Sequence, residues 1–245
     1  MKALIFAAGL GTRLKPYTDT IPKALVPVGG KPLLYHVAMK LKAAGFDELV
    51  INVHHFPDSI MDYVHEEKDF GMKVSFSDER DFLRETGGGI LYARKMLEGA
   101  PFLVHNVDIL SDLDIGWFIS QAEPDAVANI LVSDRETQRY LLFDENMRMV
   151  GWTNVATGEV RTPFTGLDPG KCRRLAFSGV HLISDRIFTI FDEDGWEGKF
   201  SIMDFYIKEC AKRIIHGILP DGLKLMDVGK VETLKDAGAF ISTIK

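Results

Sequence analysis

The sequence predicts an α/β fold: a doubly wound, mostly parallel sheet flanked by helices, with a smaller mixed β extension. Up to residue 105, short apolar runs typical of buried strands alternate with amphipathic stretches typical of helices, which is the pattern of a parallel sheet with helical crossovers. After residue 125, strand-like runs follow one another closely, separated by turn signals. With 245 residues, the chain is long enough to form one large domain around a substantial core.

The first half of the chain supplies the expected parallel sheet. Four apolar runs are predicted to be strands, at residues 2–8, 48–53, 72–77 and 101–105. Three amphipathic stretches are predicted to be helices, at residues 32–44, 57–66 and 86–98. Pro32 suits the first turn of the first helix and Gly45 suits its C-terminal cap, so both of its boundaries have a local cause.

The second half supplies the expected extension over the site. Strand-like runs occupy residues 126–132, 140–143, 147–152 and 175–183, with a turn at residues 144–146. Helices are expected at residues 203–214 and 231–241. Residues 161–171 contain two prolines and two glycines, so an irregular loop is expected there.

Charge is unevenly distributed along the chain. The formal net charge is −6, but residues 1–31 contain five Lys and Arg and only one acidic residue. A cationic segment on an acidic protein indicates a small anionic ligand and argues against nucleic acid or a membrane surface as the partner. No apolar stretch approaches the ~20 residues of a membrane helix. Cys172 and Cys210 provide no disulfide framework, so a reducing, cytoplasmic setting is expected.

The cationic segment begins with a glycine-rich turn after the first expected strand. Gly9 and Gly11 permit unusual backbone angles and let backbone N–H groups come close to a ligand, and Arg13 and Lys23 follow. The spacing differs from that of a Walker A loop, and Leu14 stands where a dinucleotide-binding fingerprint needs its third glycine. Taken alone, the glycines are equally consistent with phosphate binding and with an ordinary solvated strand–turn–helix.

Three segments that could bind a ligand follow expected strands directly. They begin at Gly9, at Ser77 and at Asn106. Because the carboxyl ends of parallel strands meet at one edge of a sheet, and ligands of such sheets bind beyond that edge, the three segments are expected to form one site.

The stretch AAGLGTRLKPYTDTIPKALVPVGGKP, residues 7–32, resembles the signature of the sugar-1-phosphate nucleotidylyltransferases. Shorter segments follow in the order in which this family has them, at residues 85–89, 106–108, 177–179 and 226–229. The closest likeness is to the group of N-acetylmuramate-1-phosphate uridylyltransferases of cell-wall recycling. The resemblance covers most of the chain. It implies a Rossmann-like sheet of the GT-A type, with the β extension on the sugar side.

The resemblance implies an enzyme that joins a nucleoside triphosphate to a sugar 1-phosphate with the help of Mg²⁺. A phosphate oxygen of the sugar 1-phosphate attacks the α-phosphorus in line, and pyrophosphate leaves. Such a transfer depends on positioning and on cations that offset charge on the oxygens. The implied catalytic residues are Arg13, which clamps the β- and γ-phosphates, Lys23, which contacts the phosphates where the attack occurs, and Asp108. Asp108 and Asp227 are the implied Mg²⁺ ligands.

Binding residues are implied in the same way. The nucleotide is expected to contact Ala8, Gly9, Leu10, Gly11, Thr12, Arg13, Glu79, Thr86, Gly87, Gly88 and Asn106. Backbone groups of residues 86–88 would read the edge of the base, although a glycine-rich helix start can equally serve packing. The sugar is expected to contact Tyr140, Asn154, Ser178 and Gly179. The basic cluster of Lys171, Arg173 and Arg174 would meet the sugar phosphate or solvent, and the sequence does not decide between them.

Some positions depart from the family pattern or have neighbours of the same type. Val107 stands where the family often has Gly, and Lys230 stands where Thr is common, so either could alter the pocket. Asp112 and Asp114 lie close to Asp108 and suit the cap of a following helix. Only the order of the segments favours Asp108 over them as a metal ligand.

We therefore expect a single, monomeric nucleotidyltransferase domain, with residues 1–124 as its nucleotide-binding half and residues 125–245 as its sugar-binding half. UTP is the favoured donor and N-acetylmuramate 1-phosphate the favoured acceptor. Guanylyl or thymidylyl transfer to mannose-, glucose- or heptose-1-phosphate is the alternative. Two rivals belong to other classes: a non-catalytic nucleotide-binding module, and an oxidoreductase that binds a nicotinamide dinucleotide. The joint presence of the four implied phosphate and metal ligands argues against the first, and the missing third glycine argues against the second.

Overall fold

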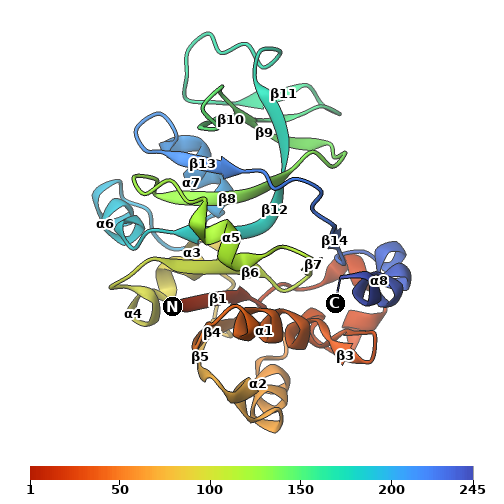
Figure 1. Ribbon diagram of the computed structural model, residues 1–245. Helices are drawn as coiled ribbons and strands as arrows, with labels where there is room; N and C mark the ends of the chain where they lie inside the picture. The colour runs from red at the N-terminus through yellow and green to blue at the C-terminus, as the bar shows by residue number, and fades with distance from the viewer. Residues whose placement is uncertain (245) are drawn as a thin grey trace.

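Figure 1 shows the computed structural model, which describes residues 1–244, and at its centre lies a ten-stranded mixed sheet. One half of this sheet is parallel. It is formed, in spatial order, by β6 (Phe102–Asn106), β1 (Lys2–Phe6), β4 (Glu48–Val53) and β5 (Lys73–Asp78). The doubly wound, mostly parallel centre predicted from the sequence is therefore confirmed.

The other half of the sheet is mainly antiparallel and continues from β6 through the long strand β12 (Arg173–Ile183). β12 pairs with β8 (Ala128–Ser133) and β9 (Arg139–Phe143), and β10 (Met149–Asn154) and β11 (Glu159–Arg161) extend the sheet beyond β9. β13 (Ile215–Ile218) runs parallel to β8. In Figure 1, β9, β10 and β11 project from the rest of the sheet, as expected of a β extension.

Helices and short strands complete the fold. The helices are α1 (Leu33–Ala43), α2 (Pro57–Glu66), α3 (Glu85–Tyr92), α4 (Arg94–Leu97), α5 (Ile115–Ser120), α6 (Arg186–Glu193), α7 (Ile202–Glu209) and α8 (Val231–Thr243). Two small antiparallel pairs join β2 (Pro27–Val28) to β3 (Lys31–Pro32) and β7 (Ile109–Ser111) to β14 (Leu225–Asp227). Single 3-10 turns lie at Thr12–Leu14, Tyr17–Asp19, Lys23–Leu25 and Lys68–Gly71. None of the helices within residues 1–244 combines the length and the apolar character needed to cross a membrane.

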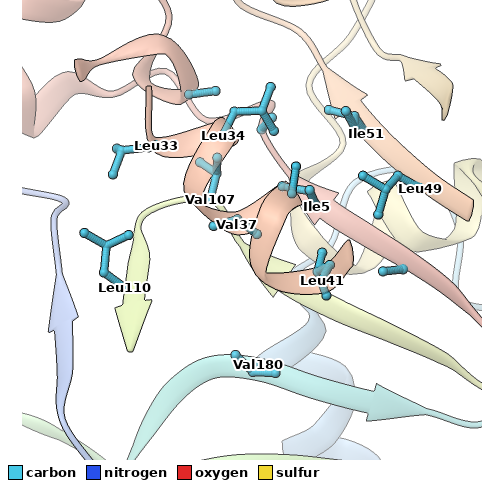
Figure 2. Close-up of a cluster of buried hydrophobic side chains, with 14 of the residues drawn as sticks. Ile5, Leu33, Leu34, Val37, Leu41, Leu49, Ile51, Val107, Leu110 and Val180 are labelled. Carbon is cyan, nitrogen blue, oxygen red and sulfur yellow. The ribbon is translucent and has the colours of Figure 1, made fainter. Parts of the chain in front are cut away.

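The inner parallel strands β1 and β4 are mostly apolar because both faces of the sheet are buried there. Ile5 and Ile51 belong to one core, which packs against α1, and Figure 2 shows this cluster. Leu4 and Val50, their neighbours along the strands, belong to a second core that packs against α3, α6 and α7. Successive side chains of a strand point to opposite faces, so a strand covered on both sides needs apolar residues at every position.

Two predicted helices differ from the observed ones. The stretch at 86–98 is divided at Ala93 into α3 and α4. The stretch at 203–214 ends as a helix at Glu209, where the N–H groups of Lys212 and Arg213 both donate to the Glu209 carbonyl and close a turn. The chain is then free to form β13, because Ile215 and the residues after it pair with β8.

Two buried histidines make the stability of this fold depend on pH. His105 on β6 and His181 on β12 are fully buried, and burial lowers the pKa of His105 to about 4 and that of His181 to about 3. In the unfolded chain both would titrate near 6.5. The folded protein thus keeps both histidines neutral. Their contribution to the free energy of unfolding is complete above about pH 6.5 and is lost as the pH falls toward 4.

We expect the free energy of unfolding to drop by about 2 kcal/mol for each histidine between pH 7.5 and pH 5. Urea titrations at both pH values measure the drop. His105→Gln should flatten the dependence, whereas His65→Gln should leave it unchanged, because the side chain of His65 is 64% exposed. A wild-type protein equally stable at both pH values would contradict the expectation.

Candidate active site

The three segments predicted to form a site do meet at one edge of the sheet. They follow the carboxyl ends of the parallel strands β1, β5 and β6. In the sheet β6 lies next to β1, and β4 lies between β1 and β5. A pocket of about 400 Å³, here called the strand-end pocket, opens there. Its lining residues are Phe6, Ala7, Ala8, Gly9, Lys23, Asn52, Leu83, Glu85, Thr86, Asn106, Val107, Asp108 and Ser201.

Asn52 and Glu79 hold the start of the glycine-rich turn in place through hydrogen bonds. The Asn52 Oδ1 accepts hydrogen bonds from the N–H groups of Ala7 at 2.7 Å and Ala8 at 3.2 Å, and its Nδ2 donates to Glu79 Oε1 at 2.9 Å. Burial raises the pKa of Glu79, whereas its bonds from Asn52 and the Arg84 N–H favour the charged form. Glu79 thus holds Asn52 rather than lining the pocket, and its predicted contact with the base stays a prediction.

Asn52 was not singled out from the sequence, although a signal for it exists. It is the polar residue within the apolar strand at residues 48–53, one position before that strand ends. A polar side chain in such a run is buried with a partner or faces the site at the strand end, and Asn52 does both.

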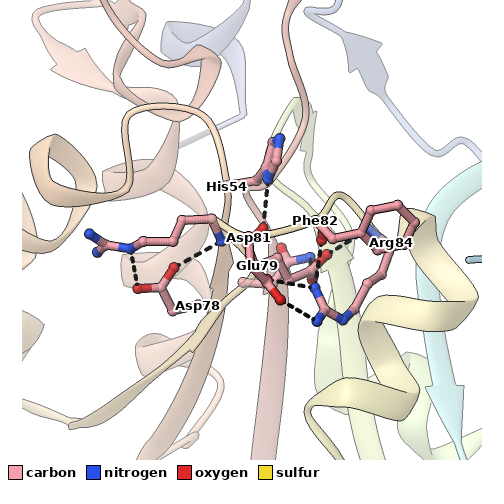
Figure 3. A network of polar contacts seen from close by, with 8 residues as sticks. His54, Asp78, Glu79, Asp81, Phe82 and Arg84 are labelled. Carbon is pink, nitrogen blue, oxygen red and sulfur yellow. Dashed lines mark hydrogen bonds and ion pairs between the residues drawn. The ribbon is translucent and has the colours of Figure 1, made fainter. Parts of the chain in front are cut away.

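The segment between β5 and α3 is held by a dense polar network, which Figure 3 shows. The Nδ1 of His54 lies 2.7 Å from the Glu79 carbonyl oxygen, and the Arg84 guanidinium donates to both carboxylate oxygens of Asp81 and to the Phe82 carbonyl. This loop borders the pocket at Leu83 and Glu85, so the network fixes one wall of the site.

Gly87 and Gly88 have a packing role in the structure. Both of their N–H groups donate to the Phe200 carbonyl, at 2.9 and 3.1 Å. A Cβ at Gly87 would lie 2.3 Å from the Phe200 ring, and one at Gly88 would lie 2.2 Å from the Gly198 carbonyl oxygen. Their N–H groups are therefore occupied, and of the predicted base-reading segment it is Thr86 that lines the pocket. Base contact by the two glycines is a prediction that the packing leaves unsupported.

Lys23 reaches the pocket because the chain folds back on the glycine-rich turn. Gly11 has φ +64°, and a Cβ there would lie 2.7 Å from Thr18 Cγ2 and 3.2 Å from Lys23 Cβ. The Thr18 hydroxyl donates to the Gly11 carbonyl at 2.8 Å and fixes this return. Lys23 Nζ then forms an ion pair with Asp108 Oδ2, and both side chains are largely buried.

Asp108, Asp227 and Arg13 converge on Gly229. A Cβ at Gly229 would lie 2.7 Å from Asp227 Oδ1, 2.9 Å from Arg13 Nη2 and 3.1 Å from Asp108 Oδ2, so the three groups share one small volume. The β7–β14 pair brings them together, helped by the Val228 N–H, which donates to the Asp108 carbonyl at 2.9 Å. The side chain of Asp114 caps α5, and that of Asp112 accepts from the Lys224 N–H, so both have local roles.

A second pocket of about 500 Å³, here called the arginine pocket, lies between α7 and strands β9, β10 and β11. Its lining residues are Arg13, Arg135, Thr137, Arg139, Leu141, Trp152, Arg161, Phe177, Ser201, Met203, Asp204, Ile207, Asp227 and Lys230. Ser201 lines both pockets, and the converging Asp108 and Asp227 each line one of them. The site thus consists of two chambers that meet at a charged junction.

The residues predicted to contact the sugar lie around these chambers in different ways. Gly179 (φ +74°) allows the bulge of β12 to approach Asn106 closely, and the Ser178 hydroxyl is buried against Ser133. The Asn154 Oδ1 accepts from the Ala156 N–H in the turn after β10. Tyr140 alternates with Arg139 and Leu141, which line the arginine pocket, so its side chain starts from the opposite face of β9. These four sugar contacts stay predictions.

A divalent cation at the junction would need oxygen ligands in addition to the two aspartates. Within residues 1–244, no cluster of three or more His, Cys, Asp or Glu side chains is arranged to hold a metal. Asp108 and Asp227 provide carboxylate oxygens in one volume, and Mg²⁺ in nucleotide sites commonly takes one or two carboxylates together with phosphate oxygens and water. The donor set therefore suits a cation that arrives with a phosphorylated ligand.

This fold and site define a nucleotide-binding α/β protein with paired aspartates and flanking cations. The model of the nucleotidyl transferase family matches residues 2–141, and the chain belongs to this family. It is 34% identical over 227 residues to an N-acetylmuramate alpha-1-phosphate uridylyltransferase of Caulobacter vibrioides, covering 90% of this chain and 89% of the relative. It is 46% identical over 114 residues to the enzyme of the same name from Neisseria meningitidis, covering 46% and 49%.

A solved structure agrees with this placement. HddC from Yersinia pseudotuberculosis, complexed with GMP-PN, superposes with a TM-score of 0.76 at 26% identity, covering 98% of this chain and 99% of that one. The Rossmann-like fold of the nucleotidyltransferases, which the resemblance implied, is thereby confirmed.

Gly229→Ala is expected to lower kcat/KM for nucleotidyl transfer roughly 10- to 100-fold, because its Cβ would displace the charged groups that meet there. The melting temperature should change little. Gly238→Ala is the matched control, since its nearest contact would be an ordinary 3.8 Å. Equal activity of the two variants would show that Gly229 does not set the geometry of the junction.

Proposed function

We propose that this enzyme transfers a uridylyl group from UTP to N-acetylmuramate α-1-phosphate, giving the nucleotide sugar and pyrophosphate. The observation that carries the proposal is the pair of chambers joined at Asp108 and Asp227, one built on the strand ends and one lined with cations. The nature of the substrates is supported by the two relatives described above, which carry the name of this activity.

We assign one half of the reaction to each chamber. The strand-end pocket takes the nucleoside triphosphate, whose base approaches Thr86 and whose phosphates approach the turn from Ala8 to Thr12. The arginine pocket takes the sugar 1-phosphate. An oxygen of the sugar phosphate forms the new bond to the α-phosphorus while the bond to the bridging oxygen of the leaving pyrophosphate breaks. The expected division at residue 124 stays a prediction, since Arg13 lines the arginine pocket and Ser201 lines both pockets.

Lys23 and Arg13 offset the charge that builds on the oxygens during transfer. Lys23 is held by Asp108 at the edge of the strand-end pocket, where its ammonium group would lie beside the attacked phosphate. Arg13 stands at the inner end of the arginine pocket, and its planar guanidinium suits two phosphate oxygens at once. Both side chains act by position and charge, which is the main help that phosphoryl-type transfer needs.

Asp108 and Asp227 would hold Mg²⁺ at the junction. When bound, Mg²⁺ would supply positive charge that neutralises part of the charge on the phosphate oxygens. Lys23 occupies Asp108 Oδ2 in the structure, and Asp227 Oδ1 accepts from the Gly229 N–H at 2.8 Å, so both carboxylates are ordered in advance. We also propose that the enzyme acts as a cytoplasmic monomer in cell-wall metabolism.

Guanylyl transfer is the nearest alternative. A mannose-1-phosphate guanyltransferase of Aspergillus oryzae shares 39% identity over 115 residues, but this match covers only 46% of the chain and 31% of the relative. The match with the uridylyltransferase of Caulobacter vibrioides covers 90% of this chain and 89% of the relative, which favours uridylyl transfer. A nucleotide-binding module without chemistry is the alternative of another class.

Asp108→Asn and Asp227→Asn are each expected to lower kcat at least 100-fold, because each removes a charge that would hold the cation. Pyrophosphate release with Mg²⁺ is measured for four nucleoside triphosphates crossed with a panel of sugar 1-phosphates. Asp114→Asn is the control, since Asn also caps a helix. Triphosphate binding without release from any pair, in the wild type, would favour the non-catalytic module.

Lys23→Ala is expected to lower kcat roughly 100- to 1000-fold while the KM for the triphosphate rises less, because its charge is needed most in the transition state. Steady-state kinetics separate the two effects. Lys15→Ala removes an exposed lysine of the same segment, which forms an ion pair with Asp19, and should keep wild-type kinetics. A rise in KM alone would mean that Lys23 serves binding and not transfer.

A further inference from the structure

The wall of the arginine pocket has more positive charge than one sugar phosphate requires. Five cationic side chains and two carboxylates line the pocket. Two of the cations, Arg13 and Lys230, stand beside Asp227 at the catalytic end. Three more, Arg135, Arg139 and Arg161, come from the β extension, which lies away from the converging aspartates.

Strand register places Arg139 and Arg161 beside an apolar floor. Arg139 and Leu141 are two positions apart on β9, so their side chains face the same side of the sheet. Leu141 pairs with Trp152 on β10, and Trp152 pairs in turn with Arg161 on β11. Leu141 and Trp152 thus form a surface suited to a sugar ring, and the guanidinium groups stand at its border. Trp152 is half-buried in the structure, consistent with one face open to the pocket.

The arginines differ in what they already bind. Arg161 forms an ion pair with Asp204 at 2.7 Å, and Arg135 donates to the Phe177 carbonyl at 3.1 Å. In the described part of the chain, Arg135 and Arg139 form no ion pair with a carboxylate. Both residues are exposed and line the pocket, so their guanidinium groups can donate to an anion that binds there.

We propose that Arg135 and Arg139 bind a carboxylate on the sugar of the acceptor, and so select acidic sugar 1-phosphates over neutral ones. The proposal rests on the proposed function, since it takes the arginine pocket as the acceptor site. N-acetylmuramate fits because it is N-acetylglucosamine with a carboxyl-bearing ether. A neutral sugar in the same position would leave both guanidinium groups without an anion.

The test compares two acceptors that differ only in that ether, N-acetylmuramate 1-phosphate and N-acetylglucosamine 1-phosphate. Arg135→Gln and Arg139→Gln should each raise KM for the acidic acceptor roughly 10- to 100-fold, as expected for a lost charge-assisted hydrogen bond, with kcat less affected. KM for the neutral acceptor and for UTP should stay within about twofold of wild type. Arg139→Lys should recover part of the loss.

Arg174→Gln is the matched control. Arg174 is an exposed arginine on β12 that pairs with Leu142, whose side chain faces the other side of the sheet from Leu141. It should leave the KM of both acceptors unchanged. Variants at Arg135 and Arg139 that impair both acceptors equally, or a wild type that does not distinguish the two acceptors, would overturn the proposal.

Calorimetric titration of each acceptor accompanies the kinetics, so that binding is measured even without turnover. Tight binding of the acidic acceptor, weakened by Arg139→Gln, supports the carboxylate site whether or not pyrophosphate is released. Absence of pyrophosphate release alone would count against the proposed function, whereas equal affinity for both acceptors would count against the carboxylate site.

Discussion

The pairing of β7 with β14 is the constraint on which the site depends. Asp108 precedes β7 and Asp227 ends β14, and three registered pairs together with the Val228-to-Asp108 hydrogen bond hold the two aspartates in place. Two carboxylates this close repel each other, and the ion pair from Lys23 and the nearby Arg13 offset that repulsion. Backbone hydrogen bonds and two cationic side chains therefore hold an arrangement that the two carboxylate charges alone would oppose.

Hydrogen bonds also fix the glycine-rich turn. Its backbone has no regular secondary structure after Phe6, yet it is ordered by a chain of polar contacts that runs from Ala7 through Asn52 and Glu79 to the Arg84 N–H. Glu79 accepts a desolvation cost for this, as its raised pKa indicates. A loop held rigid in this way is well prepared for an anionic ligand, because little ordering remains when the ligand binds.

The sequence predicted the central sheet well because its signals are local. The strand at 48–53 and the helix at 57–66 match β4 and α2 at both ends, since apolar runs, a proline start and glycine breaks define them. β7, β13 and β14 were not foreseen, because strands of three or four residues exist only through their partners. The convergence of Lys23, Asp108 and Asp227 followed from the family resemblance, not from periodicity.

The side from which a strand residue faces a site was harder to foresee. The resemblance implies a sugar contact for Tyr140, whereas its neighbour Arg139 lines the arginine pocket, because a shift of one position moves a side chain to the other face of a sheet. Which face of β9 borders the pocket depends on how β12 curves and where α7 packs. Those are long-range relations that no short segment contains.

The segment around Phe200 connects the walls of the two pockets. Phe200 receives two N–H groups from the start of α3, and the Ile202 N–H donates to the Thr86 hydroxyl, so this segment and the base-side wall are one unit. Ser201, between them, borders the arginine pocket as well. A movement of α3 that admits the donor must also reshape the acceptor chamber. A ligand that shifted α3 would therefore alter both pockets, and by reciprocity two such ligands would change each other's affinity by the same factor.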